Sequence, residues 1–275
     1  MIKISNLAFS YDSVVVLKDI SLDLQEGRIY GLLGENGVGK TTLLTLLAGL
    51  KKPESGTIDV DGQNPFDRKP SFLSNIYYLP DEVAAPHRKA LDFARDHGQY
   101  WENFSISKFS EIMKIFDTDE EFRMDQMSYG QLKKTYISFA LACNTRYLFM
   151  DEPTNGLDIP SKAQFRKAVS KYTSCESTLL ISTHQARDLE AIIDPIIILD
   201  RRDVLLNATL DEIAQKLYFD YSSDVNPTSL YSEMVPGGNI QVIPNVDGIE
   251  SKVNIEALFN AVLQHKKEIK AMFNK

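Results

Sequence analysis

The sequence predicts an α/β fold with a mixed sheet and an antiparallel edge. Three apolar runs without polar alternation, at 29–33, 147–150 and 178–182, are typical of parallel strands that are covered on both faces. The runs at 2–9 and 20–24 alternate instead, as half-exposed antiparallel strands do. Segments with helical periodicity separate the apolar runs, which favours a mostly parallel sheet.

The elements follow from these patterns in chain order. Strands are expected at Ile2–Phe9, Ile20–Leu24, Ile29–Leu33, Tyr147–Met150, Thr178–Ser182 and Ile196–Leu199. A helix is expected to begin near Lys40 and to end at Gly49, because Gly49 and the nearby Pro53 are usual stop signals.

Residues 84–135 differ from the rest of the first 205 residues. They contain little strand pattern and the only tryptophan, Trp101, and they have the character of helices. Thr118 followed by Glu121 forms a potential capping box that would open one of these helices. We therefore expect a helical insertion at about 84–135 within the α/β core.

A second change of character divides the chain into an expected cassette, 1–217, and a small accessory α+β subdomain, 218–275. Thr209 and Glu212 form a capping box before a short helix, and turn formers then separate strand-like runs such as Asn239–Ile243. One amphipathic helix is expected at the end, with its apolar face formed by Ile255, Leu258, Phe259, Val262, Ile269, Met272 and Phe273.

Composition limits the classes of function. The 275 residues carry a formal net charge of −8, which disfavours a nucleic-acid-binding surface. Two cysteines do not make a disulfide framework, no signal peptide is visible, and no apolar stretch approaches the ~20 residues that span a bilayer. The sequence therefore predicts a cytoplasmic protein, and any membrane it serves must be crossed by another chain.

A phosphate-binding loop follows the third predicted strand. Gly34-Glu35-Asn36-Gly37-Val38-Gly39-Lys40-Thr41 fits G-x-x-x-x-G-K-[ST] and opens a helix, which is the context that this motif requires. Gly34, Asn36, Gly37 and Gly39 belong to a loop whose N–H groups converge on phosphate oxygens. Lys40 is expected to reach the β- and γ-phosphates, Thr41 to ligate Mg²⁺, and Thr42 to contact the α-phosphate.

Two carboxylates end the strand at 147–150. Asp151 is placed to hold Mg²⁺, and Glu152 can point at a water beyond the γ-phosphate and act as general base. Asp-Glu alone would indicate no more than a solvated strand end. The succeeding Pro153-Thr154-Asn155-Gly156-Leu157-Asp158 changes that interpretation.

These ordered motifs resemble the ATP-binding subunit of ABC transporters. Gly34–Thr42 is similar to its Walker A motif, Tyr147–Glu152 to Walker B with the catalytic glutamate, and Asn155–Asp158 to the D-loop. Ser182-Thr183-His184 resembles the switch-histidine segment. The resemblance implies a P-loop NTPase of the ABC type in which His184 hydrogen-bonds the γ-phosphate and Tyr11 stacks on adenine, although an aromatic side chain beside a turn often only packs.

Two segments depart from the family pattern. The signature segment, usually Leu-Ser-Gly-Gly-Gln, reads Met127-Ser128-Tyr129-Gly130-Gln131 here, so Tyr129 replaces a glycine. The resemblance still implies that Ser128, Gly130 and Gln131 bind the nucleotide of the opposite protomer, whereas Ser128 alone would indicate a simple N-cap. Asp81 stands where the family commonly has Gln, and an Asp there can still ligate Mg²⁺.

The resemblance implies an ATPase that binds ATP and Mg²⁺, with Lys40, Glu152 and His184 as catalytic residues and Thr41, Asp151 and Asp81 at the metal. We expect a homodimer or heterodimer of ATPase subunits at the cytoplasmic face of the cell membrane. The dimer would power an integral-membrane permease on a separate chain, and the absence of a recognisable accessory substrate domain favours an exporter. The alternative is a soluble ABC-type ATPase that drives a cytosolic assembly.

Overall fold

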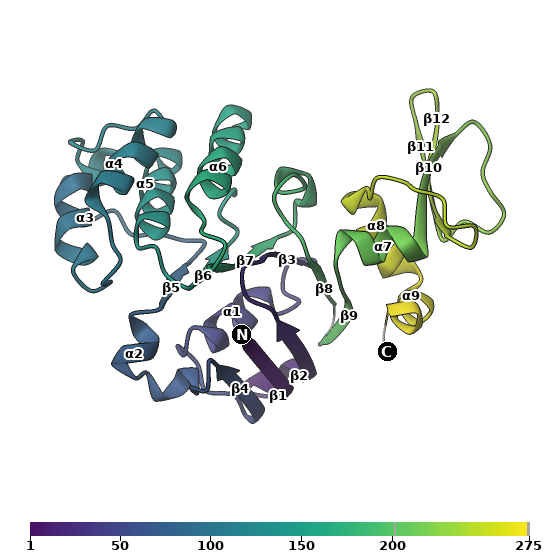
Figure 1. The fold of residues 1–275 in the computed structure, drawn as a ribbon, viewed down its shortest axis with the longest axis horizontal. Coiled ribbons are helices and arrows are strands. Elements are labelled where there is room, and N and C mark those ends of the chain that lie inside the picture. Colours follow the sequence, from purple (N-terminus) through teal and green to yellow (C-terminus); the bar gives the residue numbers. More distant parts are fainter. Residues whose placement is uncertain (201, 274–275) are drawn as a thin grey trace.

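A six-stranded mixed sheet forms the centre of the protein in the computed structural model, which describes residues 1–200 and 202–273 (Figure 1). Its strands, in spatial order, are β5 (Ile76–Leu79), β6 (Tyr147–Asp151), β7 (Thr178–Thr183), β3 (Ile29–Leu33), β8 (Ile196–Asp200) and β9 (Asp203–Ala208). All neighbours are parallel except β8 and β9. Parallel order brings the carboxyl ends of β3, β6 and β7 to one edge, where the site lies.

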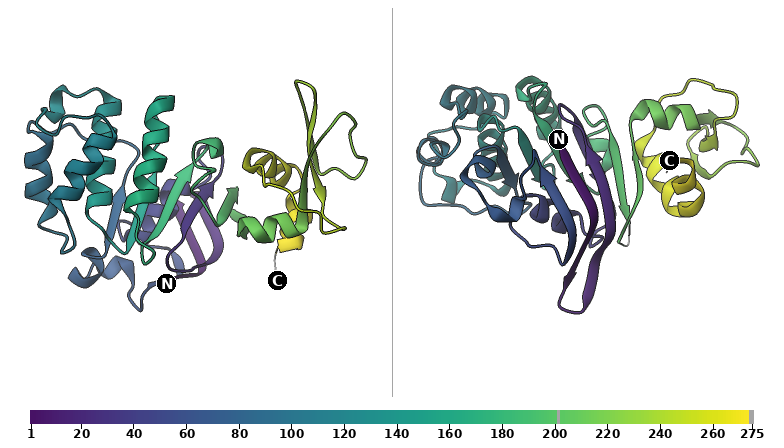
Figure 2. Two further views of the ribbon diagram at one scale, coloured as in Figure 1. Left: turned by 45° about the horizontal axis from the view of Figure 1, so that its top comes forward. Right: turned by 60° about the horizontal axis from the view of Figure 1, so that its bottom comes forward.

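A second, antiparallel sheet covers one face of the central sheet. Its order is β2 (Val14–Leu24), β1 (Ile2–Tyr11) and β4 (Ser55–Val60), and Ile2 lies opposite both Leu24 and Val60. Figure 2 shows the long β1–β2 hairpin beside the core. Helix α1 (Lys40–Leu47) is almost wholly buried and shares one apolar core with both sheets, which holds its N-terminus in a fixed position.

Helices cover the other face and form the insertion. They are α3 (Ala90–Gly98), α4 (Ile106–Ile115), α5 (Tyr129–Ala142) and α6 (Ile159–Tyr172), with the short η2 (Met124–Gln126). The short elements η1 (Pro65–Asp67) and α2 (Pro70–Leu73) lie instead on the side of α1 and β4, and η3 (Ala186–Asp188) follows β7. Trp101 fastens the insertion to the sheet, because its indole N–H donates to the Ile76 carbonyl at 2.9 Å. Helix α5 runs seven residues beyond the expected edge at 135.

The last part of the chain forms a third sheet with helices. It contains α7 (Leu210–Lys216), β10 (Leu217–Ser222), β11 (Tyr231–Val235), β12 (Gly238–Pro244), α8 (Ile255–Gln264) and α9 (Lys266–Phe273), and β12 is the middle strand of its sheet. This part lies at one end of the molecule (Figures 1 and 2). Its buried Leu258 and Val262 nevertheless belong to the same apolar cluster as Leu205 of β9 and Leu33 of β3.

The structure confirms the six expected strands, the helix that begins at Lys40 and the capping box at Thr209. The prediction of a capping box at Thr118 was wrong, because the Thr118 hydroxyl donates to the Phe116 carbonyl and Glu121 instead pairs with Lys89.

The prediction of a single C-terminal helix was also wrong. The backbone breaks at His265, and the redirected α9 brings Lys266 and Lys270 within 2.5 Å of Asp200 and Asp203. The strands at 55–60, 76–79 and 203–208 were not expected, since they are short and only pairing with neighbours makes them strands.

Within the described residues, the helices fall short of the length and apolarity that a bilayer crossing demands.

Candidate nucleotide-binding site

The loop between β3 and α1 has the backbone that a phosphate cradle needs. Gly37 and Gly39 adopt φ of +80° and +110°, which side-chain-bearing residues rarely adopt. A Cβ on Gly39 would also lie 2.8 Å from Leu17 Cδ2. The glycines thus allow the chain to turn sharply into α1, whose first N–H groups and dipole favour an anion at this point.

Lys40 lies in the centre of the site and is only 6% exposed. Its Nζ donates to the carbonyl oxygens of Gly34 at 2.8 Å and Glu35 at 3.2 Å. The third neighbour is Glu152, whose Oε1 lies 3.3 Å from Nζ. The buried ammonium is therefore compensated by two dipoles and one carboxylate, and these are the groups that a phosphate would replace.

Asp151 and Thr41 meet although they are far apart in sequence. The Thr41 hydroxyl donates to Asp151 Oδ2 at 2.6 Å, and the Ser182 hydroxyl donates to Oδ1 at 2.5 Å. These hard oxygen donors suit Mg²⁺, which usually takes one or two protein carboxylates together with substrate phosphates. Among the described residues, no group of three or more His, Cys, Asp or Glu side chains is arranged to hold a metal alone.

Glu152 has a strained backbone. Its φ is +44°, a region that non-glycine residues seldom occupy, and its N–H donates to the Ser182 hydroxyl at 3.0 Å. Ser182 therefore bridges the two acidic residues. This turn directs the Glu152 side chain toward Lys40 and His184.

His184 directly follows β7 and contacts the other carboxylate oxygen of Glu152. Its Nδ1 lies 3.0 Å from Glu152 Oε2, and its backbone N–H donates to the same oxygen at 3.3 Å. The Gln185 amide lies 3.2 Å from His184 Nε2. The catalytic residues expected from the sequence are thus brought together, with Glu152 between Lys40 and His184.

Tyr11 lies beside the helix that begins at Lys40. Its hydroxyl is 3.4 Å from the Thr42 hydroxyl, and the ring is 42% exposed. One face is near the Lys51 ammonium, 4.8 Å from the ring centroid, and Phe9 meets it edge-on. An exposed ring beside Thr42 is accessible to a base whose phosphates occupy the loop.

The signature segment opens α5. Ser128 and Gln131 form a capping box, in which the Gln131 N–H donates to Ser128 Oγ at 3.3 Å and the Ser128 N–H donates to Gln131 Oε1 at 2.9 Å. Tyr129 turns toward its own chain, because its hydroxyl donates to the Asp81 carbonyl at 3.0 Å. The nearest atom to a Cβ built on Gly130 would be the Gly156 carbonyl oxygen, at 3.6 Å.

The side chain of Asp81 contacts residues other than Thr41 and Asp151. Asp81 pairs with Lys133 and accepts from Asn155. Burial lowers the pKa of Lys133, while the Asp81 carboxylate acts in the opposite direction.

Three residues near the site were not singled out from the sequence. Ser182 was named only as part of the segment of His184, and its place two residues before His184, near the end of a parallel strand, could have indicated a role of its own. Lys133 carries no sequence signal of burial, and only the structure shows it. Tyr78 lies near Asp151, and burial together with that carboxylate raises the pKa of its hydroxyl.

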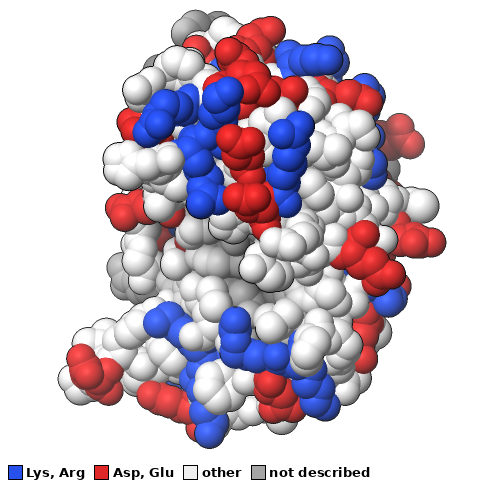
Figure 3. Space-filling view, turned by 90° about the vertical axis from the view of Figure 1, so that its left-hand side faces the viewer, with Lys and Arg blue, Asp and Glu red and all other residues white. Residues whose placement is uncertain are grey.

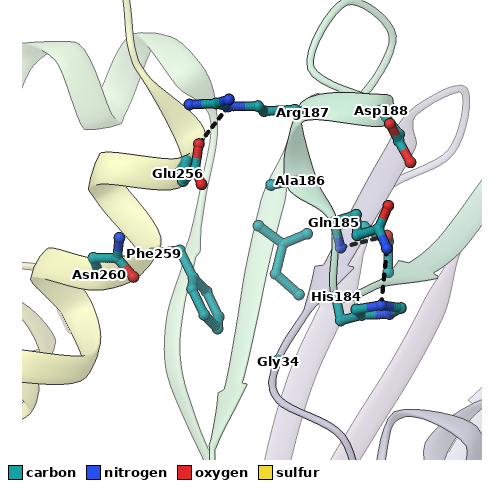
Figure 4. Close-up of a pocket in the computed structure, with 11 residues that line it drawn as sticks. Gly34, His184, Gln185, Ala186, Arg187, Asp188, Glu256, Phe259 and Asn260 are labelled. Carbon is teal, nitrogen blue, oxygen red and sulfur yellow. Dashed lines mark hydrogen bonds and ion pairs between the residues drawn. The ribbon is translucent and has the colours of Figure 1, made fainter. Parts of the chain in front are cut away.

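A cavity of about 380 Å³ separates the site from the C-terminal part (Figure 4). Gly34 and His184 line one side, and Glu256, Phe259 and Asn260 of α8 line the other. Arg187 spans the two sides through an ion pair with Glu256. The short helix η3, which begins two residues after His184, is therefore in contact with α8.

Comparison with known proteins agrees with this geometry. A model of the ABC transporter family matches residues 17–155, slightly more than half of the chain. This chain belongs to the ABC transporter family. It is accordingly an ATP-binding ATPase subunit, and such subunits form dimers and work with membrane permeases.

Similar proteins match most of the cassette. The ABC transporter ATP-binding protein YtrB of Bacillus subtilis is 29% identical over 236 residues, which are 82% of this chain and 79% of YtrB. The aliphatic sulfonates import ATP-binding protein SsuB of Zymomonas mobilis is 30% identical, covering 75% and 85%. A dimeric post-hydrolysis ATP-binding cassette bound to ADP and Pi has a similar fold, with a TM-score of 0.67, 21% identity and coverage of 76% and 99%.

Proposed function

We propose that this chain hydrolyses Mg²⁺·ATP as one half of a dimer and thereby powers a separate membrane permease. The observation that carries the chemistry is the position of Glu152, between Lys40 at 3.3 Å and His184 at 3.0 Å, next to the Thr41–Asp151 contact. A general base has to lie within hydrogen-bond reach of an attacking water, and this edge is where a γ-phosphate would end.

Each residue has a distinct part in the proposed reaction. The loop N–H groups of Gly34–Thr42 bind the phosphates, and Lys40 neutralises the β- and γ-phosphate charge. Thr41 and Asp151 would hold Mg²⁺, which supplies charge neutralisation on the phosphates when bound. Glu152 accepts a proton from the attacking water, and His184 orients that water and the γ-phosphate. Tyr11 stacks on the adenine base, and Thr42 contacts the α-phosphate.

Dimer formation is supported by the signature segment. Ser128, Gly130 and Gln131 lie at the N-terminus of the fourteen-residue helix α5, where helix dipole and free N–H groups favour an anion. Ser128 now caps its own helix, and we propose that the segment binds the γ-phosphate held by the opposite protomer. The dimeric cassette with ADP and Pi is a precedent among proteins of similar fold.

A mostly apolar groove, whose lining includes one charged side chain, Arg68, supports a protein partner. It lies between α2 and the helical insertion and is lined by Leu50, Leu73, Tyr77, Tyr100 and Trp101, among others. Tyr100 is 69% exposed. Figure 3 shows this side of the molecule, hollowed and uncharged at its centre with charged side chains above and below. Exposed apolar surface with a charged border is typical of protein interfaces, so we propose that a cytoplasmic segment of the permease docks here.

The test combines turnover with partner binding. Tagged protein is purified from detergent-solubilised membranes, and the expected result is ATPase activity together with a polytopic membrane protein. Tyr100→Glu should abolish co-purification and leave basal ATP turnover unchanged, whereas Tyr221→Glu, on β10 and 57% exposed, should leave both unchanged. ATP turnover without any membrane partner, and capture of a cytosolic complex instead, would favour the soluble-ATPase alternative.

The direction of transport has to be measured in a separate experiment. The sequence favoured export, whereas SsuB and YclP of Bacillus subtilis, two relatives whose names state a direction, are import proteins, so the comparisons lend export no support. ATP-dependent accumulation of substrate in inside-out vesicles would indicate export, and release would indicate import.

A further inference from the structure

Two separate segments converge on Asp81, the residue that replaces the family's usual Gln. Tyr129 and Lys133, one helical turn apart on α5, contact it from one side, and Asn155 contacts it from the loop after β6. We call Asp81, Tyr129, Lys133 and Asn155 the Asp81 junction. It joins the loop after β5, the signature helix and the D-loop within one protomer.

Contacts to main-chain carbonyl groups fix the loop that follows β5. The Asp81 carbonyl accepts from Lys133 Nζ at 2.5 Å and from the Tyr129 hydroxyl at 3.0 Å, and Lys133 also donates to the Pro80 carbonyl at 3.3 Å. Lys133 thus binds two successive carbonyl oxygens of the loop that follows β5. These contacts attach the loop to α5 through Tyr129 and Lys133.

The carboxylate of Asp81 is also engaged. Lys133 Nζ lies 3.3 Å from Oδ1, and the Asn155 amide lies 3.3 Å from Oδ1 and 3.4 Å from Oδ2. Among the described residues, Asp81 is the only carboxylate within ion-pair distance of Lys133, whose side chain is fully buried. A buried ammonium that loses its carboxylate is strongly disfavoured, so Asp81 is held at Lys133.

Tyr129 shows why a glycine is not needed at that position. Its ring packs on Gly156 of the D-loop so closely that a Cβ on Gly156 would lie 2.7 Å from Tyr129 Cε1, and Gly156 has φ of +76°. The ring therefore occupies space beside its own D-loop. Two departures from the family pattern, Tyr129 and Asp81, are thereby explained by one junction.

We propose that Asp81 and Lys133 act as a positioning pair, which couples the loop after β5 to the signature helix, and that Asp81 is not a metal ligand. The proposal rests on the ATPase function proposed above. With the junction intact, the start of the signature helix keeps its position relative to the loop after β5 and to Asn155. Breaking the pair leaves the protomer's own phosphate loop unchanged but misplaces the segment that the opposite site needs, so turnover should suffer more than nucleotide binding.

The experiment is a double-mutant cycle in the full chain. Asp81→Asn and Lys133→Met should each lower kcat about tenfold, with KM for ATP within about twofold of the wild-type value. The double variant should have a kcat no lower than that of the poorer single variant. Such non-additivity is expected of two residues in contact. Lys133→Arg should restore part of the activity. Lys134→Met, the neighbouring cation on α5, is the matched control and should keep kcat within about twofold.

Metal dependence separates this role from metal binding. The Mg²⁺ concentration for half-maximal turnover, and the Mg²⁺ dependence of ADP binding measured by calorimetry, should be the same for Asp81→Asn as for the wild type. Tyr129→Phe, which removes one hydroxyl and no charge, should fold normally and lower kcat less than Lys133→Met does.

The proposal is overturned if Asp81→Asn raises the Mg²⁺ requirement about tenfold while Lys133→Met behaves as wild type, or if the two effects simply add. Failure of the underlying ATPase proposal is distinguishable, because the wild-type protein itself would then release no phosphate from ATP.

Discussion

Replacing Glu152 by Gln tests the base assignment and a less obvious consequence of its contact with Lys40. Two unit charges 3.3 Å apart attract by about 5 kcal/mol at an effective dielectric constant of about 20. Most of this attraction offsets the desolvation of the two groups. The Gln side chain keeps an acceptor for His184 but loses the charge, and we expect about 1.4 kcal/mol of net attraction to be lost.

That loss changes nucleotide binding in a direction opposite to its effect on turnover. A γ-phosphate competes with Glu152 for the Lys40 ammonium, so removal of the competing charge should tighten ATP binding about tenfold. Removal of the base should lower kcat about 10²- to 10⁴-fold. Unfolding in urea without nucleotide should show a small destabilisation, because Lys40 retains its contacts with the carbonyls of Gly34 and Glu35.

The assays are phosphate release for turnover and titration with a fluorescent ATP analogue for affinity. Glu176→Gln, an exposed substitution far from the site, is the control and should change neither. Turnover by Glu152→Gln at the wild-type rate would refute its role as base. Weaker rather than tighter binding would refute the competition between Glu152 and phosphate for Lys40.

Four further predictions follow from the contacts described. Lys40→Ala should abolish measurable nucleotide affinity in the same titration, and tight ATP binding by that variant would contradict the phosphate-loop assignment. Tyr11→Ala should weaken ATP binding about tenfold while Tyr11→Phe should not, because stacking uses the ring and not the hydroxyl; equal losses would indicate a packing role. Ser182→Ala removes the bridge from Asp151 to the next backbone N–H and should cost about 1–3 kcal/mol in urea unfolding as well as lowering kcat, and an unchanged unfolding midpoint would argue against the bridge. Truncation after Leu217 should give insoluble protein, since the C-terminal helices share the main apolar core; a soluble, fully active fragment would show that the core does not need them.

Much of the fold, and the sheet edge that carries the candidate catalytic residues, could be predicted from the sequence. The apolar runs indicate the strands, and the parallel order of those strands determines where the motifs that follow them lie. The apolar runs at 29–33, 147–150 and 178–182 are parallel neighbours or near neighbours in one sheet. Their carboxyl ends therefore share an edge, and motifs that follow them have to converge. Asp151 ends β6, His184 directly follows β7, and Lys40 follows β3 after the phosphate-binding loop, so the fold brings the three residues to the same edge.

The Asp81 junction could not be predicted, because its contacts depend on tertiary geometry. Lys133 on an amphipathic helix would ordinarily extend into solvent, and only the packing of α5 against the loop after β5 buries it. The break at His265 is similar. The apolar periodicity continued through it, and the ion pairs of Lys266 and Lys270 with β8 and β9 accompany the change of direction.

The contacts of Glu152 link binding to hydrolysis. One carboxylate oxygen faces Lys40 and the other faces His184, so both oxygens that could accept a proton from water are engaged by neighbouring groups. A γ-phosphate would attract Lys40 more strongly than one carboxylate does, because it carries more negative charge. The bound nucleotide would then release one oxygen of Glu152 next to the place where the attacking water must lie. In this arrangement the substrate's own charge frees the base, and hydrolysis becomes possible only after the phosphates have taken over Lys40.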